Sequence, residues 1–76
     1  MNKIRRAKLS RILETLEELQ AELAEIAEEE EEYRDNIPEN MQGSKRYEKA
    51  DAACDSLAYA DDSLSELVDY ITEAMG

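Results

Sequence analysis

The side chains of this chain whose chemistry needs weighing are its carboxylates and its one thiol, and the 76 residues include no histidine and no tryptophan. Without histidine, Ser–His–Asp and Cys–His nucleophile systems are excluded. The single Cys54 has no metal-ligand companion, and its place on an apolar helix face is typical of a small core residue. Gly43 stands alone, so no glycine-rich phosphate loop occurs. We therefore expect no enzymatic activity and no cofactor.

Carboxylates remain as possible metal ligands, since Asp and Glu together number 20. Di-iron proteins hold metal inside a helical bundle with Glu and Glu-x-x-His pairs. Here the histidines are missing, and only Glu30 and Asp61 fall on the apolar seams described below. The acidic run also lacks the D-x-D-x-D-G pattern of a calcium loop. We expect no metal site.

Two long segments with helical periodicity must position these side chains, and the stretch at residues 35–44 separates them. This hinge contains the only proline, Pro38. In both segments, apolar residues recur at alternating spacings of three and four, which is the pattern of a heptad seam. The sequence predicts an all-α fold, a single domain in which helices over about residues 2–34 and 45–75 form an antiparallel two-helix hairpin.

Each predicted helix has its own seam. The first comprises Leu9, Ile12, Leu16, Leu19, Leu23, Ile26, Glu30 and Tyr33, flanked by Leu13, Gln20 and Ala27. The second comprises Tyr47, Ala50, Cys54, Leu57, Asp61, Leu64, Val68, Ile71 and Met75, flanked by Ala53, Ala60, Leu67 and Ala74. Antiparallel folding about the hinge pairs Tyr33 with Tyr47 at one end and Leu9 with Ile71 at the other.

A lone hairpin would leave the flanking stripes exposed. Ordering a chain costs roughly 1.5 kcal/mol per residue, and one helix–helix interface rarely offsets that cost. We therefore expect a homodimeric four-helix bundle, or else burial of the stripe on another protein. The residues expected to mediate self-association are Leu13, Leu67 and Ala74.

The hinge has its own local signals. Ile37 precedes a proline and should be extended, which ends the first helix near Arg34 or Asp35. Pro38 to Met41 can form one tight turn, Gly43 permits a backbone conformation closed to most residues, and Ser44 is a good N-cap. Ile37 and Met41 are expected to cover the open end of the core.

Asp61 is unusual because a carboxylate on an apolar seam costs stability unless it is paired. Its partner in the predicted register is Leu19, with Gln20 adjacent and no cation close. One interpretation is that Asp61 lies at the edge of the seam and reaches water while Ala60 packs. The other is a polar contact that fixes register or dimer geometry.

The formal net charge of −11 disfavours direct binding to nucleic acid or to an anionic membrane surface. It favours a protein partner with a basic surface, although it can also serve only solubility. With one cysteine, no apolar run near 18 residues and no signal-peptide pattern, we expect a soluble cytoplasmic protein.

The basic residues of the first helix gather at its start, where they oppose the helix dipole. They are Lys3, Arg5, Arg6, Lys8 and Arg11. An antiparallel hairpin brings Glu66, Asp69 and Glu73 to the same end. These carboxylates should stabilise the basic residues at the start of the first helix.

The outer face of the second helix combines carboxylates with two tyrosines, a composition suited to binding a protein. The predicted partner-binding residues are Asp55, Tyr59, Asp62, Glu66, Asp69, Tyr70 and Glu73. Carboxylates spaced by helical turns approach the charge density of duplex DNA, so such a face can occupy the nucleic-acid groove of a basic protein. A solvated face with two incidental tyrosines is the alternative.

The run RDNIPENMQGS at residues 34–44, continuing to Arg46-Tyr47-Glu48, resembles a group of small acidic two-helix proteins of unknown function. These proteins are encoded in phage and mobile-element regions of Gram-positive gut bacteria. The resemblance implies an accessory protein acting in a bacterial host, a setting in which inhibitors of host nucleases and defence proteins are frequent. The competing hypothesis is a structural adaptor that uses the apolar stripe.

Overall fold

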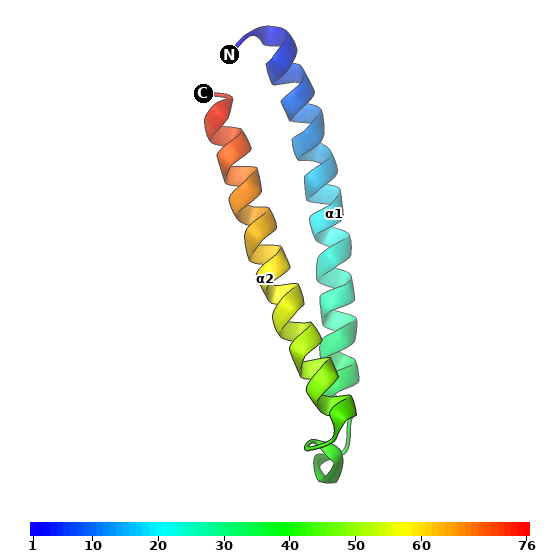
Figure 1. The fold of residues 1–76 in the computed structure, drawn as a ribbon. Helices are drawn as coiled ribbons and strands as arrows, with labels where there is room; N and C mark the ends of the chain where they lie inside the picture. Colours follow the sequence, from blue (N-terminus) through cyan, green and yellow to red (C-terminus); the bar gives the residue numbers. More distant parts are fainter.

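The computed structural model describes all 76 residues as one helical hairpin (Figure 1). Helix α1 (Lys3–Asp35) is followed by a single 3₁₀ turn, η1 (Glu39–Met41), and by helix α2 (Lys45–Ala74), with no strand. The helices run antiparallel, so both termini lie at one end of a rod measuring 59 × 16 × 12 Å. The predicted all-α hairpin is confirmed. Neither helix combines the length and the apolarity needed to span a membrane.

Polar side chains begin both helices. Asn2 Oδ1 accepts a hydrogen bond from the Arg5 amide at 2.8 Å, and Ser44 Oγ accepts one from the Tyr47 amide at 3.3 Å. These bonds satisfy amides that have no partner within the first turn of a helix. The predicted N-cap at Ser44 is therefore confirmed.

The hinge differs from the prediction in two details. The Met41 amide donates to the Pro38 carbonyl at 2.8 Å, which confirms the tight turn. Ile37 is only 2% exposed and covers the end of the core, but Met41 is 43% exposed. Gly43 does not have a positive φ, so the prediction that it adopts a backbone conformation closed to most residues was wrong. The αR backbone of Gln42 (φ −69°, ψ −16°) completes the turn without one.

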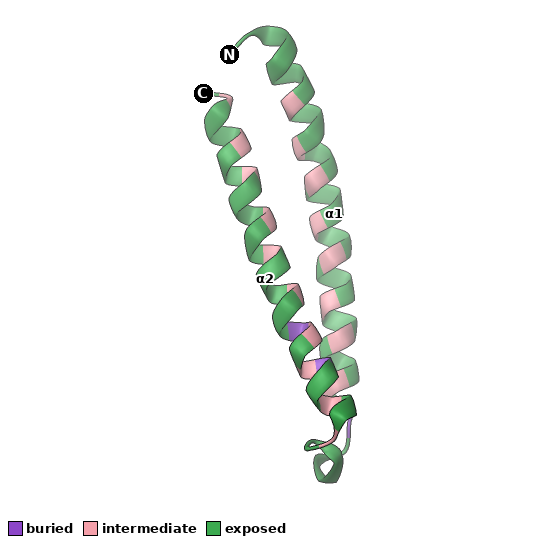
Figure 2. Ribbon diagram, viewed as in Figure 1, coloured by how far each residue is buried: buried purple, intermediate pink, exposed green.

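The buried core lies at the hinge end of the rod, as Figure 2 shows. Its members are Ile37, Ala50 and Cys54, and α1 contributes no fully buried residue. Ala50 and Cys54 are small, so the helix backbones approach closely here, and the helices diverge toward the termini (Figure 1). The prediction that Cys54 is a small buried core residue is confirmed.

Helix α2 faces α1 with its predicted seam, every member of which is buried or half-buried. Helix α1, however, is rotated relative to the prediction. Its half-buried residues are Leu9, Leu13, Leu16, Gln20, Leu23, Ala27, Glu30 and Arg34. The other members of its predicted seam, Ile12, Leu19, Ile26 and Tyr33, are 42–54% exposed and were wrongly assigned to the interface.

Polar contacts explain this rotation. Two heptad patterns share Leu9, Leu16, Leu23 and Glu30, and the prediction took the more apolar one. The structure adopts the other, which turns Gln20 and Arg34 toward α2, where both find hydrogen-bond partners. Polar groups at a helix interface are stable only when they are paired in this way.

Candidate functional site

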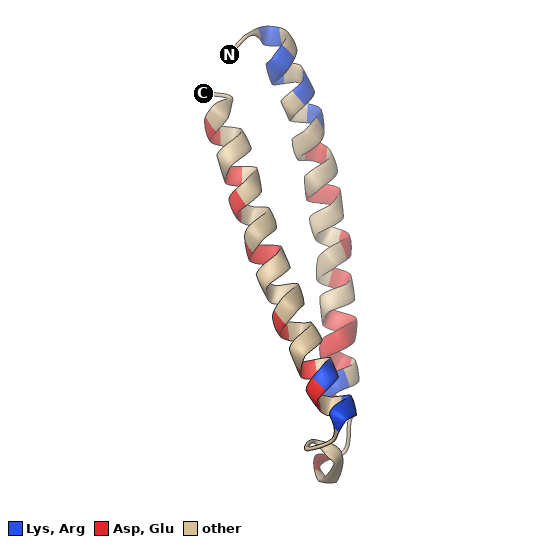
Figure 3. Cartoon of the chain, in the orientation of Figure 1, with Lys and Arg blue, Asp and Glu red and all other residues tan.

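Acidic residues recur along the length of α2 (Figure 3). All the predicted partner-binding residues of its outer face are exposed: Asp55, Tyr59, Asp62, Glu66, Asp69, Tyr70 and Glu73. Tyr59 is 73% exposed and Tyr70 is 68% exposed. The only ion pairs in the molecule join Arg34 to Asp35 and to Asp51, so no cation neutralises the carboxylates of this face.

A second surface is apolar, and we call it the apolar face. It comprises Ile12, Leu19, Ile26 and Tyr33 of α1 with Ala53, Ala60, Leu67 and Ala74 of α2. All eight residues occupy the same heptad position, the one just before every second seam residue. In an antiparallel pair of helices, such positions lie on one side. Apart from the half-buried Ala53, all are exposed. The hairpin thus leaves one apolar side without a partner.

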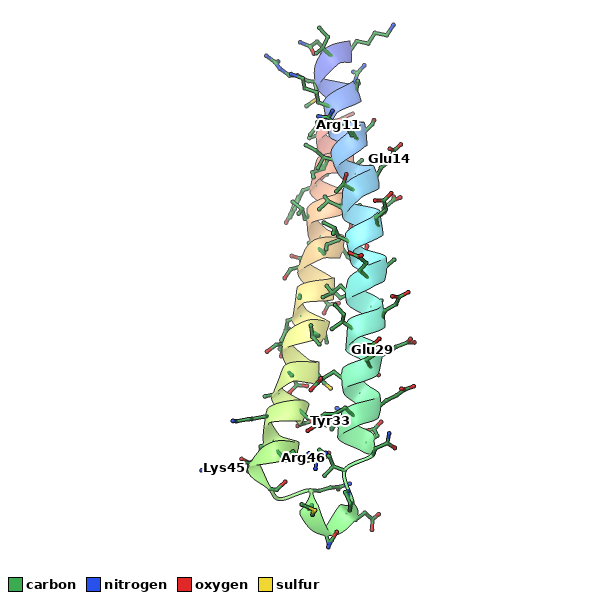
Figure 4. All side chains as sticks on the ribbon, turned by 90° about the vertical axis from the view of Figure 1, so that its right-hand side faces the viewer. Arg11, Glu14, Glu29, Tyr33, Lys45 and Arg46 are labelled. Carbon is green, nitrogen blue, oxygen red and sulfur yellow. The ribbon has the colours of Figure 1, made fainter.

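Contacts at the hinge end confirm that these two rows lie on one side. Arg46, which shares the heptad position of Ala53, donates from Nε to the Tyr33 hydroxyl at 2.7 Å. Its guanidinium carbon also lies 5.2 Å from the centre of the Tyr33 ring (Figure 4). A cation over an aromatic ring is attracted to it. This contact ties the two helices together at the hinge end of the apolar face.

The residues predicted for self-association divide between two environments. Leu67 and Ala74 are exposed on the apolar face, as predicted. Leu13, expected to flank the seam, instead lies within it and is half-buried against α2. This correction follows from the rotation of α1. The exposed apolar side chains that accompany Leu67 are therefore Ile12 and Leu19, which sequence reasoning had placed in the interface.

Asp61 is held by a neutral side chain. Gln20 Nε2 lies 3.0 Å from Asp61 Oδ1 and 2.9 Å from Ser65 Oγ. Asp61 is half-buried whereas Ala60 is exposed, so the interpretation in which Ala60 packs was wrong. The carboxylate is thus paired within the seam by the residue that the predicted register placed beside it.

Charged groups surround Cys54. Burial raises the pKa of its thiol, and the nearby carboxylates of Glu30, Glu31 and Asp51 raise it further against the opposing effect of Arg34. Hydrogen bonding to Asp35, the largest cause, raises the pKa of Arg34. A thiol kept neutral is a poor nucleophile. Cys54 therefore behaves as a core residue.

The side opposite the apolar face carries a shallow groove of about 250 Å³. Its lining residues are Leu23, Ala24, Ala27, Glu28, Glu31, Cys54, Leu57, Ala58 and Asp61. Most of them are small or apolar. No group of three or more His, Cys, Asp or Glu side chains is arranged to hold a metal ion anywhere in the chain.

The basic start of α1 lies beside the end of α2 (Figure 3). Arg6 Nε donates to the Met75 carbonyl at 3.2 Å, which satisfies a carbonyl left free at a helix C-terminus. The carboxylates expected to balance this charge, Glu66, Asp69 and Glu73, form no ion pair with it. The negative end of the α2 dipole is thus what Arg6 contacts directly.

No family model matches this chain, and neither a curated protein nor a solved structure is significantly similar to it. The two surfaces are therefore interpreted from their own charge and geometry.

Proposed function

We propose that this protein is a non-enzymatic binding module that attaches to a basic protein through the acidic outer face of α2. The observation that carries the proposal is the array of exposed carboxylates on that face, none of them in an ion pair. A net charge of −11 accelerates association with a basic surface. Tyr59 and Tyr70 add the exposed aromatic area that protein interfaces favour.

The spacing of the charges supports one class of partner. Asp62, Glu66 and Asp69 recur at successive turns of one helix, so they offer a row of negative charge comparable to a phosphate backbone. A protein that handles nucleic acid would present a matching basic groove. Together with the resemblance to phage and mobile-element proteins, this supports an inhibitor or regulator of a nucleic-acid-handling or defence protein in the cytoplasm of a bacterial host.

The test is capture of partners from a bacterial lysate by three immobilised proteins. These are the native chain, a variant with Asp62→Asn, Glu66→Gln and Asp69→Asn, and a control with Glu18→Gln, Glu22→Gln and Glu25→Gln on α1. Both variants lose three negative charges. A difference in partner capture therefore reflects which face carries the charges and not the total charge. The proposal expects the α2 variant alone to lose a basic, nucleic-acid-handling partner, and equal retention of that partner by both variants would overturn it.

We also propose that the hairpin self-associates into a homodimeric four-helix bundle, which the exposed apolar face supports. The alternative function is a structural adaptor in which a different protein covers that face and the acidity serves only solubility. Leu67→Glu discriminates between the two surfaces. In the adaptor it abolishes attachment to the partner, while neutralising Asp62, Glu66 and Asp69 is tolerated.

A further inference from the structure

We infer that the apolar face docks on the apolar face of a second copy with both hinges at the same end of the bundle, so that α1 of each copy packs on α2 of the other. This inference rests on the proposed self-association and specifies its surface and orientation. Three observations support it: the exposed area, the sizes of the side chains and the arrangement of charge.

The exposed area exceeds that of a typical folded monomer of this mass. The chain exposes 5984 Å², whereas a folded monomer of 8.7 kDa exposes about 4,700 Å². The excess of about 1,300 Å² exceeds the roughly 800 Å² that each partner buries in a standard interface. A second copy covering one side of the rod accounts for an excess of this size.

The two halves of the apolar face differ in side-chain size. The α1 row consists of large residues, whereas the α2 row has alanine at three of its four positions, Ala53, Ala60 and Ala74. With the hinges together, the row of large residues on α1 lies over the partner's α2 row, which is mostly alanine. With the hinges at opposite ends, large residues of α1 would meet large residues of the partner's α1, and alanines would meet alanines. Only the first arrangement fills the layer evenly.

The register within one hairpin sets the pairs between copies. Tyr33 contacts Arg46, and Gln20 contacts Asp61, so residues whose numbers add up to about 80 lie at one level along the rod. A two-fold axis parallel to the rod keeps these levels. Leu19 then faces the partner's Ala60, and Ile12 faces the partner's Leu67.

Charge beside the apolar face fits the same orientation. Glu29 projects from α1 away from α2 (Figure 4), next to the row that contains Ile26 and Tyr33. Lys49 is exposed at the equivalent position of α2, at the same level. With the hinges together, Glu29 of each copy comes opposite the partner's Lys49. With the hinges apart, α1 of each copy would pack on α1 of the other, so Glu29 would not face Lys49.

The test is a distance between spin labels at the hinge. Asn40→Cys in a Cys54→Ala background gives one exposed attachment site per chain. Light scattering should give twice 8.7 kDa, and the labels should lie within about 30 Å, since neighbouring helix axes in a bundle are about 8–10 Å apart. A dimer with labels separated by nearly the 59 Å length of the rod would overturn the orientation but leave self-association standing. A monomer at all concentrations would overturn both.

Charge reversal gives a second readout that does not depend on labelling. Glu29→Lys and Lys49→Glu should each weaken dimerisation about threefold, and the double variant should restore it. Glu14→Lys and Lys45→Glu, exposed charges at other heptad positions, are the matched controls. Additive losses in the Glu29 and Lys49 double variant would contradict the proposed pairing. Binding by the acidic face is measured separately with the variants at Asp62, Glu66 and Asp69, so the two proposals can fail independently.

Discussion

Gln20 of α1 donates a hydrogen bond from Nε2 to Oδ1 of Asp61 on α2, at 3.0 Å, midway along the hairpin. The pair occupies seam positions where a heptad pattern favours apolar residues. It fixes which of the two possible faces of α1 meets α2, because only one rotation brings the amide to the carboxylate. That rotation in turn determines which apolar side chains remain exposed.

Breaking this pair from one side should cost more than removing both partners. Gln20→Leu leaves the half-buried Asp61 carboxylate without its donor, and we expect a loss of about 1 kcal/mol in the free energy of unfolding. Gln20→Leu combined with Asp61→Leu replaces both groups and should be more stable than the single variant. Urea unfolding of the four proteins in this cycle measures the coupling, and strictly additive effects would show that the pair contributes nothing.

Replacing Gly43 of the hinge by alanine should stabilise the protein. Gly43 has no positive φ, and a Cβ added there would meet nothing within 4 Å. Gly43→Ala should therefore stabilise the protein by about 0.4–1 kcal/mol by restricting the unfolded chain. Thermal unfolding checks this, and a lowered melting temperature would mean that the hinge needs the freedom of glycine.

Ile37→Ala tests whether the core is concentrated at the hinge end. Ile37 is the most deeply buried side chain, so its truncation should cost about 2–4 kcal/mol. Ile4→Ala is the matched control, because Ile4 is largely exposed near the other end. If both variants unfolded at the same urea concentration, the hinge-end core would not be the main source of stability.

Stability should fall in alkali through Cys54. Its pKa is raised in the folded protein, so the neutral thiol is favoured there. The resulting contribution is fully present below the ordinary thiol pKa of about 8.5 and is lost as the pH rises through the folded value. Urea unfolding at about pH 7 and about pH 9.5 should show a larger decrease for the native chain than for Cys54→Ala. Equal decreases would contradict the assignment.

Much of the fold could be predicted from local signals. The hinge proline, the Ser44 cap and the apolar periodicity of α2 set the helix boundaries and one seam. The rotation of α1 could not be predicted from apolarity, because two heptad patterns share half their members and the less apolar one forms the interface. The acidic face was predictable because it needs only helical spacing. The full apolar face was not, since it depends on that rotation.

Binding of the captured partner, titrated with salt, tests the proposed function most directly. If the outer face of α2 binds a basic protein, affinity falls steeply as salt rises, and neutralising Asp62, Glu66 and Asp69 weakens binding and flattens that dependence. The control variant at Glu18, Glu22 and Glu25 should retain most of the native affinity. Undiminished binding by the α2 variant, with an unchanged salt dependence, would contradict the account.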